Sequence, residues 1–311
     1  MKAHGIRRAV GRLVLSGSLL AGAACGRSDV VLLLTADAEG GLGACESCSA
    51  AGGLGDITRR ATLVGTLRHD RLGLLLVDAG NALVGPDSIA SGGRVIVAAY
   101  DTLGYDAVNL SYRDFRLGKA ATLALVGAAR FSVVSANLLD ETSGRLVAAP
   151  FVVKRAGAVR VAFVGLTELP AGVGNLEHLR TQLAGLRVRP PIDALREWLP
   201  RAEAESDRVV LLFYGSAHGL DAVSQTYGAR LAAILVGGLR PGDLPQRTSP
   251  PTAATTERGT HVARIELPAS GPAEVVQFPV DGRYRRDLRM LDVLKTFDRK
   301  TFDGGKKPPV M

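Results

Sequence analysis

The sequence lacks any apolar run of the roughly 20 residues needed to cross a bilayer, so we do not expect an integral membrane protein. Its 311 residues include only three cysteines and five histidines, and aromatic residues make up 5% of the chain. No basic stripe interleaved with aromatic residues is present, which argues against nucleic-acid binding. Apolar residues reach 47% and charged residues 22%, values that indicate a globular chain of one large or two modest domains.

The excess of positive charge, +8 in total, is confined to the two ends of the chain. Residues 1–24 carry four basic and no acidic groups, residues 281–311 carry nine basic and five acidic groups, and residues 25–280 carry 25 of each. We therefore expect a neutral body followed by a basic C-terminal tail, residues 281–311, that is disordered from Thr301 onward. Contact of this tail with anionic lipid and a solvated, partly helical end are both compatible with its composition.

Residues 1–25 have the order of a secretory signal peptide. A basic stretch through Arg12 is followed by the apolar run Leu13–Leu20 and then by the small residues Ala21–Ala24. Cys25 comes next and resembles the lipidated cysteine of a bacterial lipoprotein; ordinary cleavage within residues 21–24 would instead leave a soluble protein. We predict export to the periplasm or cell envelope, with a membrane anchor on Cys25.

The other two cysteines, Cys45 and Cys48, form a C-x-x-C pair in a Gly-rich loop. An oxidising compartment favours a short local disulfide between them. A zinc site would need a second ligand pair, which the sequence lacks, and haem attachment would need histidine where Ser49 stands. The alternative interpretation makes this loop a redox or partner-docking centre.

From residue 29 the chain alternates short β-branched or Leu-rich runs with longer segments of helical period. The predicted strands are Val30–Leu34, Leu72–Asp78, Ala107–Leu110, Ser132–Ala136, Phe151–Arg155, Val159–Leu166, Arg208–Phe213, Ala233–Val236, His261–Leu267 and Glu274–Val280. The predicted helices are Gly55–Asp70, Ile89–Leu103, Lys119–Arg130, Pro191–Glu205 and Gly219–Ala229. Most of the strands are continuous apolar runs, typical of strands covered on both faces, so we predict an α/β domain over residues 29–280.

Several segments of this body carry a family resemblance. Leu103–Val108 resembles "LGYDAV", Ser135–Leu138 resembles "SANL", Val159–Thr167 resembles "VKVAFIGLT", and Gly52–Leu54 with Arg59–Val64 resembles "GGLARRATLV". In this order they resemble the N-terminal metallophosphoesterase domain of the 5′-nucleotidase family, part of the calcineurin-like phosphoesterases. The resemblance implies a metallophosphoesterase-like four-layer α/β/β/α sandwich over residues 29–280. The separate C-terminal substrate domain of full 5′-nucleotidases is not expected here.

The resemblance also implies a site of two divalent metals that activate water and hold phosphoryl oxygens, with ligands at the carboxyl ends of strands. Asp37 matches the first Asp of the motif D-x-H, and Glu39 stands at its His. Asn81 stands at the bridging Asp of G-D. The remaining correspondences place Tyr112 and Arg113 at the Asn and His of G-N-H-E, Tyr214 at a lone strand-end His with His218 four residues later as a substitute, and Gly238–Pro241 at G-H-x-H.

These substitutions predict a catalytically degenerate protein. Of the five histidines, only His218 lies near a predicted strand end, so a site built from imidazoles cannot be assembled. Arg113 and Arg240 add positive charge to the same cleft, and arginine binds phosphate or carboxylate in a bidentate manner. We predict a non-catalytic module, without a bound cofactor, that binds a phosphate-containing or other anionic small ligand. Structural pairing of the two arginines with Asp114 and Asp243 is the alternative.

A second interpretation keeps enzymatic activity. A single metal would be held by Asp37, Glu39, Asn81 and His218, an oxygen-rich set that suits Mn, Mg or Ca rather than Zn. The protein would then be a metal-dependent phosphoesterase of the nucleotidase type. No feature of the sequence identifies a protein partner.

Overall fold

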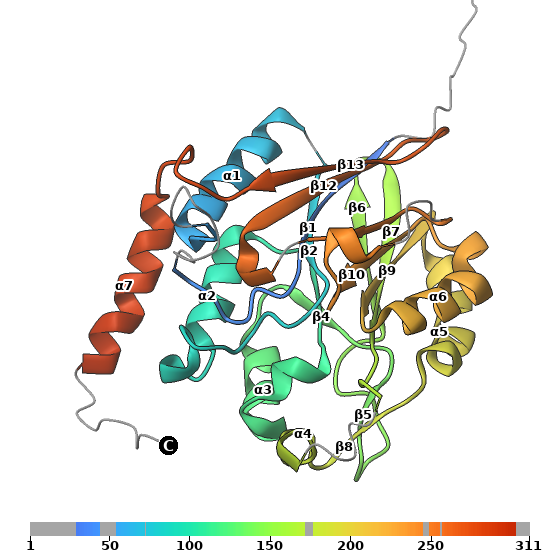
Figure 1. The fold of residues 1–311 in the computed structure, drawn as a ribbon, viewed down its shortest axis with the longest axis horizontal. Coiled ribbons are helices and arrows are strands. Elements are labelled where there is room, and N and C mark those ends of the chain that lie inside the picture. The colour runs from blue at the N-terminus through green and yellow to red at the C-terminus, as the bar shows by residue number, and fades with distance from the viewer. Residues whose placement is uncertain are drawn as a thin grey trace, which may run out of the picture.

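The computed structural model describes residues 29–43, 54–71, 73–171, 177–244, 249–255 and 257–302 (Figure 1). The predicted signal peptide, Cys25, Cys45 and Cys48 all lie outside these residues. Within the described part of the chain, no helix combines the length and the apolar composition that crossing a bilayer requires.

The first sheet has six strands in the order β13-β12-β1-β2-β3-β4. Their bounds are β1 (Val30–Thr35), β2 (Leu75–Asp78), β3 (Ala107–Asn109), β4 (Ser132–Val134), β12 (His261–Leu267) and β13 (Glu274–Pro279). Strands β1 to β4 are parallel, whereas β12 is antiparallel to β1 and β13 is antiparallel to β12. The carboxyl ends of β1, β2 and β3 therefore meet at one edge of the sheet.

The second sheet has five strands in the order β11-β10-β9-β7-β6. Their bounds are β6 (Phe151–Ala156), β7 (Val159–Thr167), β9 (Arg208–Tyr214), β10 (Ala233–Gly237) and β11 (Thr252–Ala254). A hairpin joins β6 to β7 through Gly157, whose φ of 60° suits a tight turn. Two further strands, β5 (Leu138–Asp140) and β8 (Leu186–Val188), pair with each other.

Helices cover the outer faces of both sheets (Figure 1). They are α1 (Ile57–Asp70), α2 (Arg94–Leu103), α3 (Gly118–Ala128), α4 (Glu177–Gln182), α5 (Pro191–Glu205), α6 (Ala217–Tyr227) and α7 (Leu288–Phe302). Local sequence fixes where some of them begin. The Asp56 side chain accepts a hydrogen bond from the Thr58 amide at the start of α1, and Pro191 occupies the first turn of α5.

Alternating side chains divide the interior into three apolar clusters. On β1, Val31 and Leu33 face the helices α1 and α2, whereas Leu32 and Leu34 face the second sheet. A third cluster lies between the second sheet and the helices α5 and α6. The two sheets therefore pack face to face between helical layers, and the predicted α/β/β/α sandwich is confirmed.

The packed domain continues past Val280, where the sequence prediction ended it. The Asp287 amide donates to the Thr58 carbonyl oxygen, and Met290 is fully buried on the cluster that α1 and α2 form. Leu294 and Phe297 pack against the same cluster. The partly helical end that the sequence allowed is an amphipathic helix, with apolar residues at spacings of three and four, and its high charge did not indicate that it packs against the domain.

Candidate functional site

The candidate site lies where parallel strands from both sheets end, as the topology predicts. Asp37 and Glu39 follow β1, Asn81 follows β2, Tyr112 follows β3 by three residues, and Tyr214 is the last residue of β9. The structure brings Asp37, Asn81 and Tyr214 into direct contact, although they come from three separate parts of the sequence.

The loops after β1 and β2 are joined to each other by their backbones. The amides of Asp37, Glu39 and Gly40 donate to the carbonyl oxygens of Gly80, Asn81 and Ala82, respectively, at 2.8–3.0 Å. Asp37, Glu39 and Asn81 have φ values of 51°, 50° and 61°. A non-glycine residue in this left-handed region costs about 1–2 kcal/mol, so the surrounding bonds must hold these residues in place.

Both carboxylate oxygens of the buried Asp37 accept hydrogen bonds from the protein. Oδ1 accepts from Asn81 Nδ2 at 2.9 Å and from Tyr214 Oη at 3.0 Å. Oδ2 accepts from the Gly238 amide at 2.7 Å. Three donors, at the ends of three different strands, therefore compensate the negative charge of Asp37.

The Tyr214 ring occupies a cradle of glycines. A Cβ atom on Gly237 would lie 2.7 Å from the Tyr214 ring, and a Cβ on Gly80 would lie 3.2 Å from it. The Tyr112 ring meets it edge-on, with the two centroids 5.7 Å apart. Burial, together with the charge of Asp37, raises the pKa of Tyr214 well above its ordinary value. The hydroxyl therefore stays protonated and acts as a donor to Asp37.

Asn81 connects the acidic residues of the site. Its Nδ2 lies 3.5 Å from Glu39 Oε1, and its backbone amide donates to Ser111 Oγ and Asp114 Oδ2. Its Oδ1 is buried and has no hydrogen-bond partner among the described residues. This leaves an unsatisfied acceptor beside Asp37 and Glu39.

The Asp114 carboxylate is fully used by local donors and does not pair with Arg113. It accepts from the amides of Ala82, Leu83 and Ser111 and from the Ser111 hydroxyl, at 2.6–2.9 Å. The predicted alternative of an Arg113–Asp114 ion pair is therefore wrong, because the acid serves as a backbone anchor.

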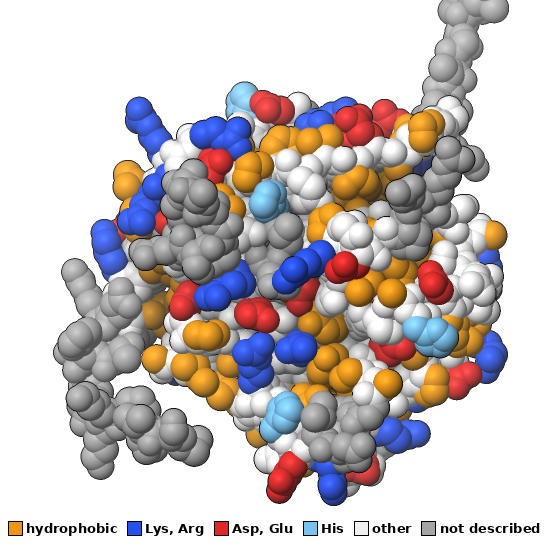
Figure 2. Space-filling model, viewed as in Figure 1, with side chains coloured by type: hydrophobic (Ala, Val, Ile, Leu, Met, Phe, Trp, Pro, Cys, Tyr) orange, Lys and Arg blue, Asp and Glu red, His pale blue; other side chains and the backbone are white. Residues whose placement is uncertain are grey.

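The arginines of the site lie at its rim. Arg113 is exposed, and its guanidinium carbon lies 5.7 Å from the centre of the Tyr112 ring. Burial alone would lower the pKa of Arg113, but Tyr214, Tyr112 and Asp37 together raise it. Arg240 is exposed at the start of the short helix Pro241–Asp243, and its amide donates to Asp243 Oδ2 at 3.1 Å. In Figure 2, basic and acidic side chains stand side by side near the middle of the face in view.

His218 does not join the other predicted metal ligands. It is exposed in the first turn of α6, two residues after the N-cap Ser216. Among the described residues, no three His, Cys, Asp or Glu side chains gather closely enough to hold a metal ion.

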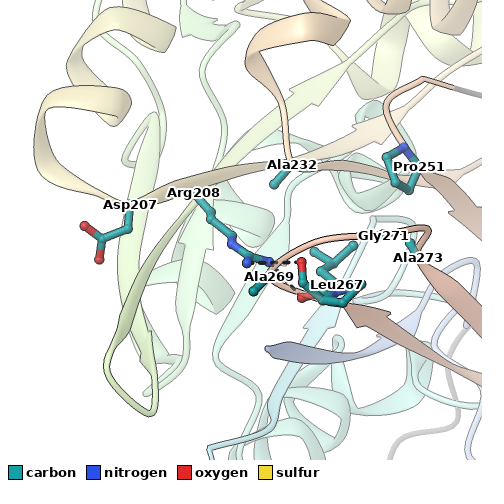
Figure 3. A pocket seen from close by; sticks show the side chains of 9 residues that line it. Asp207, Arg208, Ala232, Pro251, Leu267, Ala269, Gly271 and Ala273 are labelled. Atoms are coloured by element: carbon teal, nitrogen blue, oxygen red, sulfur yellow. Dashed lines mark hydrogen bonds between the residues drawn. The ribbon is translucent and has the colours of Figure 1, made fainter. Parts of the chain in front are cut away.

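The pocket drawn in Figure 3 lies at the opposite ends of the strands. It has a volume of about 340 Å³ and is lined by Arg208 at the start of β9, by Ala232 before β10, and by the turn from Leu267 to Ala273. The Arg208 guanidinium donates to the carbonyl oxygens of Leu267 and Pro268. This pocket is therefore separate from the candidate site, and its arginine supports the turn.

Comparison with solved structures identifies the fold. The calcineurin-like phosphoesterase YfkN from Bacillus subtilis superimposes with a TM-score of 0.70 at 20% identity, over 90% of this chain and 99% of that chain. The chain has the metallophosphoesterase fold. The sulfate thiohydrolase SoxB of Thermus thermophilus (TM-score 0.75, 18% identity) matches over 90% of this chain and 62% of its own. A 5′-nucleotidase precursor from the same organism (TM-score 0.70, 18% identity) matches over 88% of this chain and 59% of its own.

Curated sequences confirm the predicted resemblance of this metallophosphoesterase-fold chain to 5′-nucleotidases. A snake venom 5′-nucleotidase of Gloydius brevicauda is 32% identical over 121 residues, which are 36% of this chain and 20% of that protein. The 5′-nucleotidase of Vibrio cholerae is 24% identical over 197 residues, 58% of this chain and 35% of that protein. The matched region thus spans a fifth to about a third of these relatives. No family model matches the chain.

The residues of the site do not fit the two divalent metals that the fold family implies. Asp37 already accepts three hydrogen bonds, and Asn81 contributes a neutral amide beside it. Tyr214 adds a phenol that stays protonated, which is a poor metal ligand. The donor set therefore favours hydrogen bonding within the protein over coordination of cations.

Sequence reasoning missed two contributors to the site. Arg116 Nη2 lies 3.7 Å from Glu39 Oε1 and holds this carboxylate at the rim. Tyr214 was identified as a replaced position and not as the donor to Asp37. The glycines at positions 80 and 237 could have indicated it, because both stand at strand ends where a large ring needs space.

Proposed function

We propose that this chain is an exported, lipid-anchored protein of the cell envelope in which the metallophosphoesterase fold serves as a non-catalytic binding module. The closed hydrogen bonding of Asp37 by Tyr214, Asn81 and Gly238 carries the proposal. A carboxylate whose charge is already compensated by hydrogen-bond donors gains little further stabilisation from binding a cation. The resemblance places further ligands at Tyr112 and Arg113, side chains that do not bind divalent metals well.

The ligand of this module is an anionic small molecule, bound at Arg113 and Arg240. Arg113 is exposed and permanently charged, and its neighbour Asp114 is occupied by backbone amides. Two guanidinium groups at the rim can hold phosphate or carboxylate oxygens in a bidentate manner.

Elemental analysis tests the loss of the metal centre. Residues 26–311 are incubated with excess Mn and Zn, freed of unbound ions by desalting, and analysed for metal per chain, with phosphoesterase activity measured in parallel. We expect neither bound metal nor hydrolysis. Two ions held tightly per chain would overturn the proposal.

Calorimetry with inorganic phosphate tests the anion site. We expect the variant Arg113→Ala/Arg240→Ala to lose binding that the wild type shows. The variant Arg130→Ala/Arg196→Ala removes two exposed arginines elsewhere and serves as the matched control for net charge. Equal affinities in all three proteins, or no binding by the wild type, would contradict the proposed site.

One observation favours a second function, a phosphoesterase with a single metal. The buried Asn81 Oδ1 lacks a partner among the described residues, and Glu39 lies beside the same amide group. Oxygen ligands of this kind suit Mn, Mg or Ca. This function predicts a metal-dependent phosphoesterase activity that Asp37→Ala abolishes while Asn109→Ala, at a buried asparagine outside the acidic cluster, leaves it measurable.

A further inference from the structure

The segment that leads from β13 into α7 carries four arginines within seven residues. Together with one leucine they form an outward-facing surface, which we name the arginine ridge: Arg283, Arg285, Arg286, Leu288 and Arg289. All five residues are exposed. In Figure 1 this segment runs beside α1, and in Figure 2 several basic side chains project from this part of the molecule.

The backbone beneath the ridge is fixed to the folded domain. The Arg59 guanidinium donates to the Tyr284 carbonyl oxygen, and Thr62 Oγ1 donates to the Arg285 carbonyl oxygen at 2.8 Å. On the far side of the ridge, Met290 is fully buried against the core. The arginine side chains are therefore presented on a rigid surface and not on a free tail.

The charges of the ridge are arranged in two layers. The side chains of Arg283, Arg286 and Arg289 are 58–87% exposed, whereas their acidic partners are only 6–26% exposed. Those partners are Asp281, Asp56 and Asp287, respectively. A membrane that approaches from solvent therefore meets the guanidinium groups before their acidic partners.

We propose that the arginine ridge docks the protein on an anionic lipid surface. Clusters of four or more basic residues bind phosphodiester headgroups, and each residue near the surface contributes about 1 kcal/mol. Leu288 is 74% exposed among these arginines and can enter the apolar side of the headgroup layer. A nucleic-acid backbone offers no such apolar partner, and Tyr284, the aromatic residue of the segment, is half-buried.

This surface is distinct from the strand-end cleft and is independent of the function proposed for it. It would supply a second membrane contact beside the predicted lipid anchor on Cys25.

The test is co-sedimentation of residues 26–311 with vesicles of phosphatidylcholine alone or with equimolar phosphatidylglycerol. This chain lacks Cys25, so no acyl group contributes. We expect binding to the anionic vesicles only, weakened by high salt. The variant Arg283→Gln/Arg285→Gln/Arg289→Gln should bind about a hundredfold more weakly, since three arginines each lose about 1 kcal/mol. It keeps Arg286, which pairs with the α1 cap Asp56.

A control variant, Arg130→Gln/Arg145→Gln/Arg196→Gln, makes the same change of net charge at exposed positions outside the ridge. It should bind like the wild type, and Leu288→Gln should bind more weakly than the wild type. Thermal melting verifies that each variant folds. Equal losses in the two triple variants, or binding to phosphatidylcholine alone, would overturn the proposal. So would competition by inorganic phosphate at constant ionic strength, which would indicate a site for the free ion.

Discussion

The substitution Asn81→Asp is the most direct test of the hydrogen bonds that Asp37 accepts within the site. It replaces Nδ2, which donates to Asp37 Oδ1 at 2.9 Å, with a second carboxylate oxygen. Two charges at this separation repel by about 6 kcal/mol at an effective dielectric constant of about 20. The two carboxyl groups of the variant can share one proton, and this limits the loss in the free energy of unfolding. Raising a carboxyl pKa from about 4 to about 7 costs about 4 kcal/mol at pH 7.

The loss of stability caused by Asn81→Asp depends on pH with a definite sign. The folded variant keeps the shared proton to a higher pH than the unfolded chain does, so its stability falls as the pH rises from about 4 to about 7. We expect a free energy of unfolding about 4 kcal/mol below that of the wild type at pH 7, and only about 1.5 kcal/mol below it at pH 5. Urea denaturation in EDTA, followed by the fluorescence of the single tryptophan, Trp198, measures both values.

A divalent cation should restore the variant but not the wild type. The two carboxylates and Glu39 would form an oxygen-rich set, and Mn²⁺ at a hundred times its Kd stabilises by about 2.7 kcal/mol. Asn137→Asp is the matched control, because Asn137 is also buried but its Nδ2 donates to the carbonyl oxygens of Thr167 and Arg189. Equal stability of Asn81→Asp and the wild type at pH 7 would refute the hydrogen bond from Asn81 to Asp37. Equal stabilisation of both proteins by Mn²⁺ would show that the hydrogen bonds to Asp37 do not prevent it from binding a cation.

Three further substitutions test the site, a buried acid at the end of β2, and the extent of the domain. Tyr214→Phe keeps the ring in its glycine cradle but removes the donor to Asp37, so urea denaturation should show a loss of about 2 kcal/mol; no loss would mean that the hydroxyl does not reach the carboxylate. Burial raises the pKa of Asp78 to about 7, so this group should lower wild-type stability by roughly 4 kcal/mol as the pH rises from about 4 to about 7. Asp78→Asn should reduce the measured slope by that amount, and an unchanged slope would assign it to other groups. Met290→Ala should cost about 2–4 kcal/mol in a single unfolding transition, whereas a negligible loss would show that α7 is not part of the domain.

The strands of the two sheets were predictable because most of them are buried on both faces. β7 from Val161 and β9 from Val209, for example, are nearly continuous apolar runs, and the predicted bounds of both strands agree with the structure within one residue. The strands β5, β8 and β11 have three residues each, too few for any periodicity to appear. The pairing of two sheets came from the family resemblance, because apolar runs alone do not say which sheet a strand joins.

The location of the site was predictable, but its bonding was not. The family resemblance, whose ligands lie at the carboxyl ends of strands, placed Asp37, Asn81 and Tyr214 together. Positions at strand ends do not indicate which side chain donates a hydrogen bond to which acceptor. The hydrogen bond from Tyr214 to Asp37 depends on the glycines that let the Tyr214 ring approach. His218 failed as a substitute ligand because it lies at the start of α6 on an exposed face, beyond the strand end itself.

The geometry of the loops does not depend on a cation. The loops after β1 and β2 are linked by backbone hydrogen bonds, and the left-handed residues Asp37, Glu39 and Asn81 are held by them. Asp114 adds further bonds to backbone amides of the second loop. Since protein donors supply all of these interactions, the fold can keep the shape of a phosphoesterase site whatever becomes of its chemistry. Likeness of shape to the solved relatives therefore does not report activity, which the proposed function ties to the hydrogen bonding of Asp37.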